Sequence, residues 1–319
     1  MKKSVLVSTG SYLPEKTLTN FDLEKMVDTD NEWIIERTGI RERRIAATNE
    51  LTSDLAVKAL NNALNKAELS PEDIDLIIVA TTTPDLTFPA TAVCVQEKLG
   101  IKNCAAFDIQ AVCSGFIYAL SVADGLLKSG NFKRAAIIGA ETISRIIDWK
   151  DRNTCILFGD GAGAVILEAR ENTDKGILAF TLNSDCSTKE ILRTSGGVSL
   201  NQKAGVLTME GKEVFKHAVT KLASCTNESL EKAGIKAEDI NWVIPHQANQ
   251  RILDATIKKL GVAPEKLIST VAKHGNTSAA SIGLAIDYSF AENKFKSGDI
   301  LALQAIGGGL TWGSVIIKL

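Results

Sequence analysis

Long apolar runs are missing from this chain of 319 residues. Residues 1–16 contain only one short apolar run, Val5 to Val7, which cannot form the apolar core of a signal peptide. No other segment approaches the roughly 18 consecutive apolar residues that a membrane helix needs. We therefore expect a cytoplasmic protein that does not insert into a membrane.

An excess of charge of either sign is also missing. The chain has 36 Lys and Arg residues against 38 Asp and Glu residues, for a formal net charge of −2. Such a balance argues against nucleic acid as the main partner. The three histidines are not spaced as metal ligands, and the six cysteines contain no C-x-x-C pair. We expect no metal site, and we interpret the cysteines as free thiols.

An internal repeat is the strongest signal that is present. Residues 63–79, ALNKAELSPEDIDLIIV, align without a gap with residues 229–245, SLEKAGIKAEDINWVIP, and seven of the seventeen positions are identical. Each copy is typical of a helix end, a linker and an apolar strand. Three further matches follow in the same order: EKLGI (97–101) with KKLGV (258–262), NFKRAAIIGAE (131–141) with KFKSGDILALQ (294–304), and GAVIL (163–167) with GSVII (313–317). The pattern predicts a duplicated α/β fold with halves 1–171 and 172–319.

Cys113 lies in AVCSGF (111–116), between a strand expected over 104–110 and a helix expected over 116–130. This corner places the thiol near a helix N-terminus, where backbone N–H groups and the macrodipole favour the thiolate. The motif by itself leaves two interpretations open, a reactive thiol and an inert packed cysteine.

The two halves differ in chemistry at matching places. ATTTPD (80–85) in the first half corresponds to HQANQR (246–251) in the second, and AVCSGF corresponds to HGNTSAAS (274–281). Packing of the halves about a pseudo-twofold axis would bring a cysteine, a histidine and an asparagine over one cleft. These residue types suit covalent acyl transfer, with the thiolate as nucleophile and the others as donors or proton carriers.

The motifs AVCSGF, HQANQRI, HGNTSAAS and IGGGLTWGS, together with DNEWIIERTGIRERR (30–44), resemble the β-ketoacyl-[acyl-carrier-protein] synthase III family from the first strand to the last. The resemblance implies a thiolase-like fold of five αβαβα layers and a homodimer. It also implies decarboxylative Claisen condensation of a short acyl-CoA, expected to be acetyl-CoA, with malonyl-[acyl-carrier protein]. The products would be a 3-oxoacyl-[acyl-carrier protein], CoA and CO2, and the reaction would initiate fatty-acid synthesis without a cofactor beyond the CoA thioester substrate.

The resemblance also implies roles for individual residues. Cys113 would carry the acyl group, His246 and Asn276 would hydrogen-bond the malonyl thioester oxygen, and the backbone N–H groups of Cys113 and Gly308 would form a second oxyanion hole. The CoA-binding residues would be Thr29, Trp33, Arg37 and Arg152. The acyl pocket would include Phe88, Phe158 and Ile306. The carrier-protein contacts would be Gln247, Ala248, Asn249, Gln250, Arg251, Lys216, Lys258 and Lys259.

Two of these assignments carry a qualification. Ile306 stands where the family usually has phenylalanine, so the packing around the thiol is expected to be looser. Phe88 would close the end of the partner's acyl pocket or, alternatively, would be an ordinary core residue. The glycines of FGDGAGA (158–164) are interpreted as turn and packing residues, because a strand follows them and not the helix that a phosphate loop requires.

Related classes are separated by what the chain lacks. A thiolase needs a second cysteine in its C-terminal half to act as base, and the last cysteine here is Cys225, well before the IGGGL loop. Elongating synthases carry histidine at the position of Asn276, and chalcone-synthase-like enzymes are longer. Two alternatives stay open: a synthase III-like enzyme that primes a secondary metabolite from another acyl-CoA, and a non-catalytic partner subunit of the same fold.

Overall fold

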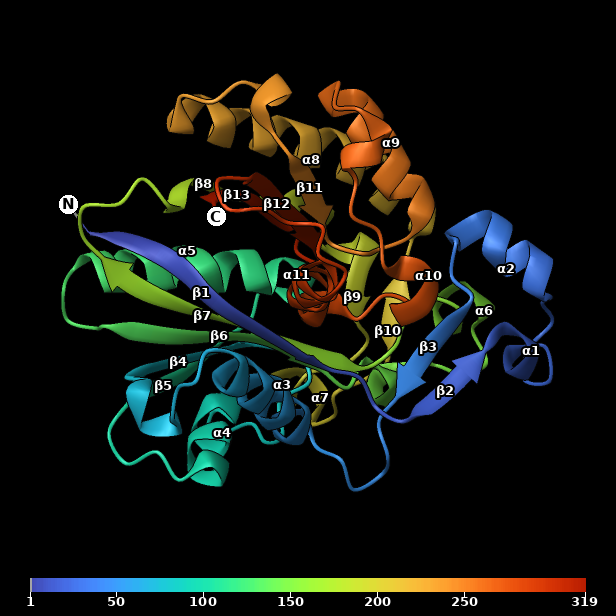
Figure 1. The fold of residues 1–319 in the computed structure, drawn as a ribbon. Coiled ribbons are helices and arrows are strands. Elements are labelled where there is room, and N and C mark those ends of the chain that lie inside the picture. Colours follow the sequence, from blue (N-terminus) through green and yellow to red (C-terminus); the bar gives the residue numbers. More distant parts are fainter. Residues whose placement is uncertain (1) are drawn as a thin grey trace.

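Two β-sheets organise residues 2–319, the part of the chain that this computed structural model describes (Figure 1). The first sheet contains β1 (Lys3–Tyr12), β4 (Leu76–Ala80), β5 (Ala105–Ile109), β6 (Arg134–Glu141) and β7 (Gly161–Arg170). The second contains β8 (Gly176–Ser184), β11 (Trp242–Pro245), β12 (Ile300–Gly307) and β13 (Thr311–Lys318). All strands of the first sheet precede all strands of the second, and the division at residue 171 stays a prediction.

The two sheets have the same topology, which confirms the duplication predicted from the repeat. The strand order is β1-β7-β6-β4-β5 in the first sheet and β8-β13-β12-β11 in the second. In the first sheet β1–β7 and β7–β6 are antiparallel and β6–β4 is parallel, and in the second sheet β8–β13 and β13–β12 are antiparallel and β12–β11 is parallel. The additional pair of the first sheet, β4–β5, is also parallel. The counterpart of β5 is reduced to a single bridge between Val243 and Leu267.

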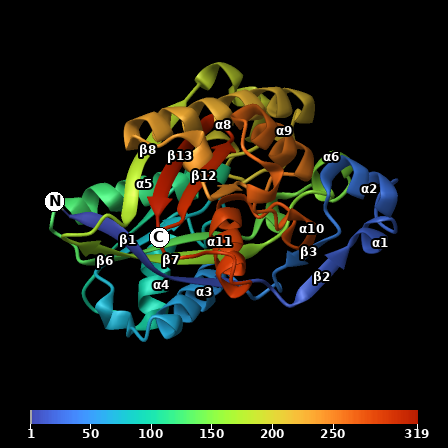
Figure 2. The same cartoon turned by 45° about the horizontal axis from the view of Figure 1, so that its top comes forward.

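The helices form three layers around the two sheets (Figures 1 and 2). α3 (Thr52–Lys66) and α4 (Thr91–Leu99) cover the outer face of the first sheet, and α8 (Gly211–Ala233) and α9 (Gln250–Leu260) cover the outer face of the second. α5 (Gly115–Lys128) and α11 (Ser281–Ala291) lie between the sheets. Both central helices are apolar nearly all round, as buried helices are. The result is the five-layer αβαβα fold expected from the sequence.

Shorter elements frame the ends of the central helices. They are β2 (Lys16–Thr19), α1 (Asn20–Leu23), α2 (Asn31–Thr38), β3 (Glu42–Ile45), α6 (Arg152–Cys155), β9 (Leu192–Thr194), α7 (Val198–Asn201), β10 (Leu207–Met209) and α10 (Val271–His274). The 3-10 turns are η1 (Pro71–Asp73), η2 (Val112–Ser114), η3 (Ile143–Ile146), η4 (Cys186–Ile191), η5 (Ala237–Asp239), η6 (Pro264–Lys266) and η7 (Ser278–Ala280). No helix in residues 2–319 is long and apolar enough to cross a membrane.

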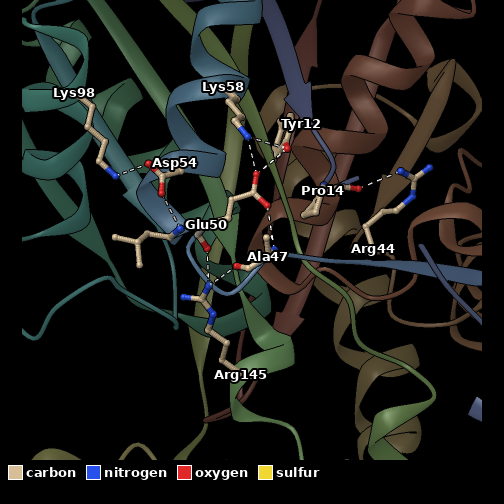
Figure 3. Close-up of polar contacts among 10 residues, drawn as sticks. Tyr12, Pro14, Arg44, Ala47, Glu50, Asp54, Lys58, Lys98 and Arg145 are labelled. Carbon is tan, nitrogen blue, oxygen red and sulfur yellow. Dashed lines mark hydrogen bonds and ion pairs between the residues drawn. The ribbon is translucent and has the colours of Figure 1, made fainter. Parts of the chain in front are cut away.

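The loop between β3 and α3 is held by a polar cluster (Figure 3). The Glu50 carboxylate accepts hydrogen bonds from the Tyr12 hydroxyl at 2.7 Å and from Lys58 Nζ at 2.6 Å. Arg145 of η3 donates to the backbone carbonyl of Glu50 at 2.6 Å. These contacts attach the loop that follows β3 to β1, α3 and η3, and so position the β2–β3 segment, which carries α1 and α2, against the first sheet and its helices.

Close backbone contact fixes α11 against β7. A Cβ atom added to Gly163 of β7 would lie 2.3 Å from the backbone nitrogen of Leu284, and one added to Gly283 would lie 2.8 Å from the carbonyl carbon of Gly163. Real Cβ atoms essentially never approach so closely. Gly163 is therefore a packing residue, as predicted.

This contact generates a stability prediction. Gly163→Ala must push α11 away from β7, and we expect it to lower the free energy of unfolding by about 1–3 kcal/mol or more. Gly125→Ala is the matched control, because Gly125 is exposed on α5 and an added Cβ meets nothing within 4 Å. It should raise the free energy of unfolding by about 0.5–1 kcal/mol. Urea unfolding of both variants measures this, and equal effects would contradict the packing role of Gly163.

Candidate active site

Cys113 lies in η2, at the corner between β5 and α5 that the sequence predicts. Its thiol is buried, with 6% of the residue exposed. Burial raises the pKa of the Cys113 thiol to about 12; the nearby Glu141 carboxylate also raises it, whereas a hydrogen bond with Ser278 lowers it. The expectation that the corner favours the thiolate is therefore wrong, because desolvation of the sulfur outweighs the helix N-terminus.

His246 follows β11 and is held as a neutral donor. Its Nδ1 lies 2.7 Å from the Ser281 hydroxyl oxygen, which also accepts the backbone N–H of Gln247 at 3.3 Å. In the tautomer that carries the imidazole hydrogen on Nε2, the Ser281 hydroxyl donates to Nδ1, and this is the tautomer that presents a donor to a ligand. Burial lowers the pKa of His246 to about 3, so the ring is uncharged at neutral pH.

Asn276 is oriented by hydrogen bonds with Ser278 and with residues 157–159. Its Oδ1 accepts the backbone N–H of Ser278 at 3.0 Å, so Nδ2 is the group left for a ligand. Its backbone pairs with the segment around Phe158: the Asn276 N–H donates to Leu157, and its carbonyl accepts from Gly159 at 3.0 Å. Within residues 2–319, neither Nδ2 of Asn276 nor Nε2 of His246 donates to a protein atom.

One segment, residues 276–281, brings the three predicted catalytic residues together. Asn276 begins it, Ser278 lies in η7, which packs against the η2 turn that holds Cys113, and Ser281 hydrogen-bonds His246. The segment leads into α11, whereas Cys113 leads into α5. The site is therefore formed where the two central helices begin.

The glycine run 307–309 is required by the protein backbone itself. A Cβ added to Gly307 would lie 2.7 Å from the backbone nitrogen of Cys113, and one added to Gly308 would lie 2.8 Å from the Leu192 carbonyl oxygen. β12 thus meets the Cys113 backbone without room for side chains. The oxyanion role of the Gly308 N–H stays a prediction.

A cleft of about 810 Å³ opens beside the site. Its lining includes Trp33, Arg37, Asn153, Asn249 and Arg251. Two of the predicted CoA-binding residues, Trp33 and Arg37, are therefore in one cleft, and the Arg37 guanidinium lies 5.8 Å from the Trp33 ring centroid.

The other two predicted CoA-binding residues, Thr29 and Arg152, do not line this cleft. The Arg152 guanidinium lies 4.9 Å from the Trp33 ring centroid and donates to the Asp28 carbonyl at 2.8 Å. Arg152 also lines a neighbouring hollow of about 390 Å³. The Thr29 hydroxyl oxygen is buried and has no hydrogen-bond partner in the described part of the chain.

The three predicted acyl-pocket residues do not lie in one environment. Phe158 and Ile306 are buried, with 3% and 7% exposed, whereas Phe88 is 82% exposed in the loop between β4 and α4. Phe88 is therefore not a core residue of this chain and closes no pocket within it. Its contribution to a partner's pocket stays a prediction.

One predicted carrier-protein contact is wrong. Gln247 is 1% exposed, and its side chain donates to the carbonyls of Pro245 and Ile268 and accepts the N–H of Thr270 at 2.7 Å. The Gln247 side chain is therefore buried and links two segments of the chain, so it cannot contact a carrier protein. The other predicted contacts are at least partly exposed: Ala248, Asn249, Gln250, Arg251, Lys216, Lys258 and Lys259.

Sequence reasoning missed the residues that hold the catalytic groups. Ser278 and Ser281 lie inside a motif that was singled out, but nothing in the motif distinguishes them from their neighbours. Glu141 ends the apolar run AAIIGA, and an acidic residue at the end of a buried strand is a signal that could have found it. In residues 2–319, no group of three or more His, Cys, Asp or Glu side chains is arranged to hold a metal ion.

The duplicated five-layer fold places a buried thiol directly before one central helix and two neutral donors in the other half of the chain. These features define the class of thiolase-fold acyltransferases. Within that class, residues 107–186 match the family model for 3-oxoacyl-[acyl-carrier-protein] synthase III, and residues 230–319 match the model for its C-terminal part.

Individual proteins agree with the family models. The β-ketoacyl-[acyl-carrier-protein] synthase III of Rhizorhabdus wittichii is 54% identical over 318 residues, covering 100% of both chains. The crystal structure of the synthase III from Aquifex aeolicus VF5 is 49% identical with a TM-score of 0.95, covering 99% of this chain and 100% of that one. The priming β-ketosynthase of the R1128 polyketide pathway is 33% identical with a TM-score of 0.94, covering 99% and 96%. This chain belongs to the β-ketoacyl-[acyl-carrier-protein] synthase III family.

The high pKa of Cys113 predicts how the thiol reacts with iodoacetamide. Because only the thiolate reacts, the alkylation rate at Cys113 should rise about tenfold per pH unit from pH 7 to pH 10. Peptide mass spectrometry measures the rate, with Cys113→Ala as the control for the other thiols. A plateau below pH 8 would mean that the resting enzyme holds a thiolate.

Proposed function

We infer that this chain joins a short acyl-CoA to malonyl-[acyl-carrier protein] by decarboxylative Claisen condensation, with release of CoA and CO2. Membership of the family over the full chain supports the reaction. The observation that carries the mechanism is the packing of segment 276–281 against η2, which holds the buried thiol, while the same segment orients the free neutral donors of His246 and Asn276.

The first half-reaction is acyl transfer to Cys113. The Cys113 sulfur forms a bond to the acyl carbon, the bond from that carbon to the CoA sulfur breaks, and the thiol proton leaves with CoA. The N–H groups of Cys113 and Gly308 are proposed to stabilise the oxyanion of this step. Since burial favours the protonated thiol, the proton has to leave the sulfur as the bond to the acyl carbon forms.

The second half-reaction begins with loss of CO2 from the malonyl group. The electron pair of the broken carbon–carbon bond moves onto the thioester oxygen, where Nε2–H of His246 and Nδ2–H of Asn276 are proposed to donate. Both donors are neutral, so neither has to titrate during the step. The resulting carbanion attacks the acyl carbon on Cys113, and the thiolate that leaves takes up one proton.

The two substrates are proposed to approach through the cleft beside Trp33. Trp33 and Arg152 offer an aromatic face and a guanidinium plane to a purine, and Arg37 and Thr29 offer further polar contacts. Arg251 lies exposed at the same cleft, where a positive charge suits an acidic carrier protein. Lys216, Lys258 and Lys259 are the other exposed cations proposed for the carrier.

A second candidate is the priming of a secondary metabolite from another acyl-CoA. The 33% identical priming ketosynthase has a TM-score of 0.94, and Ile306 near the thiol makes primer choice the property that could differ. The primer that becomes attached to Cys113 from a mixture of acyl-CoAs distinguishes the two candidates. A non-catalytic partner role is disfavoured, because Cys113, His246 and Asn276 are all present.

The donor pair generates a kinetic prediction. His246→Ala and Asn276→Ala should each slow CO2 release from malonyl-CoA by about 10²-fold or more, and the double variant should lose little beyond that, because two donors to one oxygen act as a unit. Acetylation of Cys113 from acetyl-CoA should survive in all three. Loss of acetylation with normal CO2 release would reverse the roles.

The exposed ring of Phe88 generates a prediction about assembly and primer length. A homodimer is proposed in which Phe88 enters the partner's acyl pocket and leaves room for acetyl or propionyl groups only. Phe88→Thr should then accept longer acyl-CoAs, because overpacking costs about 1–3 kcal/mol and exceeds the gain from one buried methylene. Light scattering and primer competition test this. A monomer, or equal use of octanoyl-CoA and acetyl-CoA by the unaltered enzyme, would refute it.

A further inference from the structure

Glu141, the last residue of β6, is a buried carboxylate that the mechanism above does not use. It is 0% exposed, and no cation pairs with it among the described residues. Its two oxygens accept hydrogen bonds from five donor groups: Thr81 Oγ1, the Thr82 backbone nitrogen, Thr82 Oγ1, Thr83 Oγ1 and Ser278 Oγ. A buried carboxylate without a counterion persists only when it is hydrogen-bonded in this way.

The donors come from two loops on opposite halves of the fold. Residues 81–83 follow β4 and lead to the loop that carries Phe88. Ser278 belongs to segment 276–281 of the second half. Glu141 therefore joins the end of a strand in the first half to the segment that orients Asn276.

Ser278 is held in an unusual backbone conformation. Its φ is +49°, a left-handed value that non-glycine residues rarely adopt and that costs free energy. In this conformation its hydroxyl donates to Glu141 Oε1 at 3.0 Å, and its backbone N–H donates to Asn276 Oδ1 at 3.0 Å. The bond to Glu141 thus stabilises the conformation that fixes the Asn276 amide.

We propose that Glu141 is a positioning residue for decarboxylation: it anchors Ser278, and Ser278 turns Asn276 so that Nδ2 faces the malonyl thioester oxygen. The inference rests on the proposed function. It assigns to Glu141 a supporting role in one half-reaction only, because acyl transfer to Cys113 does not use the Asn276 amide. Loss of the Glu141 charge removes one cause that raises the pKa of the Cys113 thiol, so acyl transfer should not slow.

Glu141→Gln tests this with little change in shape. The amide replaces one of the two acceptor oxygens by a donor. Ser278 and the Thr82 hydroxyl donate to Oε1, whereas Thr81 and Thr83 donate to Oε2, so either orientation of the amide removes the acceptor of two hydroxyl groups and disturbs the cluster that anchors Ser278. We expect kcat for CO2 release from malonyl-CoA to fall about tenfold, the effect of one lost hydrogen bond, with KM changed less than threefold. Acetylation of Cys113 by acetyl-CoA should stay within about threefold of the unaltered enzyme or become faster.

Asp287→Asn is the matched control. Asp287 of α11 is also a buried carboxylate, and it accepts from Thr9, Ser11 and Lys66 without touching segment 276–281. A purely structural defect in Asp287→Asn or Glu141→Gln would change both half-reactions together. An equal loss of both half-reactions in Glu141→Gln, or no loss of CO2 release, overturns the proposal.

Ser278→Ala tests the same link from its other end and serves if Glu141→Gln does not fold. It should also slow CO2 release about tenfold, and the double variant should lose no more than about twofold beyond either single variant, because both act through one hydrogen bond. Full additivity of the two losses contradicts the link. If the unaltered enzyme releases no CO2 from malonyl-CoA, the proposed function fails and not this inference alone.

Discussion

The site depends on one packing constraint, the close approach to β4 and β6 of the segments where α5 and α11 begin. A Cβ added to Gly139 of β6 would lie 2.2 Å from the Ala279 carbonyl oxygen, and one added to Gly115 would lie 3.2 Å from the Cβ of Ala80. Because Cys113 precedes α5 and Asn276 precedes α11, this contact sets the positions of both. Rigid elements thus hold groups from two distant segments, which is what a site with fixed donors needs.

The second property of the site is that it holds little charge. Burial shifts the pKa of Cys113 upward and that of His246 downward, so both are neutral at pH 7. Neutral donors suit a reaction in which negative charge develops briefly on a thioester oxygen and then disappears. The carboxylate of Glu141 can be buried nearby because five donor groups hydrogen-bond to its oxygens in place of water.

The sequence was sufficient to predict the topology and the convergence of Cys113, His246 and Asn276 on one site, for different reasons. The gapless repeat at 63–79 and 229–245 required two similar sheets, and it placed Cys113 and Asn276 at equivalent corners. It could not show that the counterpart of β5 is a single bridge at Leu267. That reduction depends on tertiary packing, because the apolar pattern alone does not say which residues complete a ladder.

Burial is the property that the sequence predicted least well. Gln247 has the composition of an exposed loop residue, yet three backbone groups from different segments satisfy its amide. Cys113 has the local geometry of an activated thiol, yet the depth of the site reverses the shift of its pKa. The role of Glu141 is visible only in the folded chain, because its hydrogen-bond donors come from both halves. Each of these depends on contacts between residues far apart in sequence.

Mass spectrometry of the intact protein after incubation with acetyl-CoA tests the central claim most directly, namely that each half of the chain contributes a separate half of the chemistry. The account predicts one added acetyl group, at Cys113, in the unaltered enzyme and in Asn276→Ala, and none in Cys113→Ala. Acetylation of Cys113→Ala at the same level, or its absence from Asn276→Ala while that variant remains folded, would contradict the account.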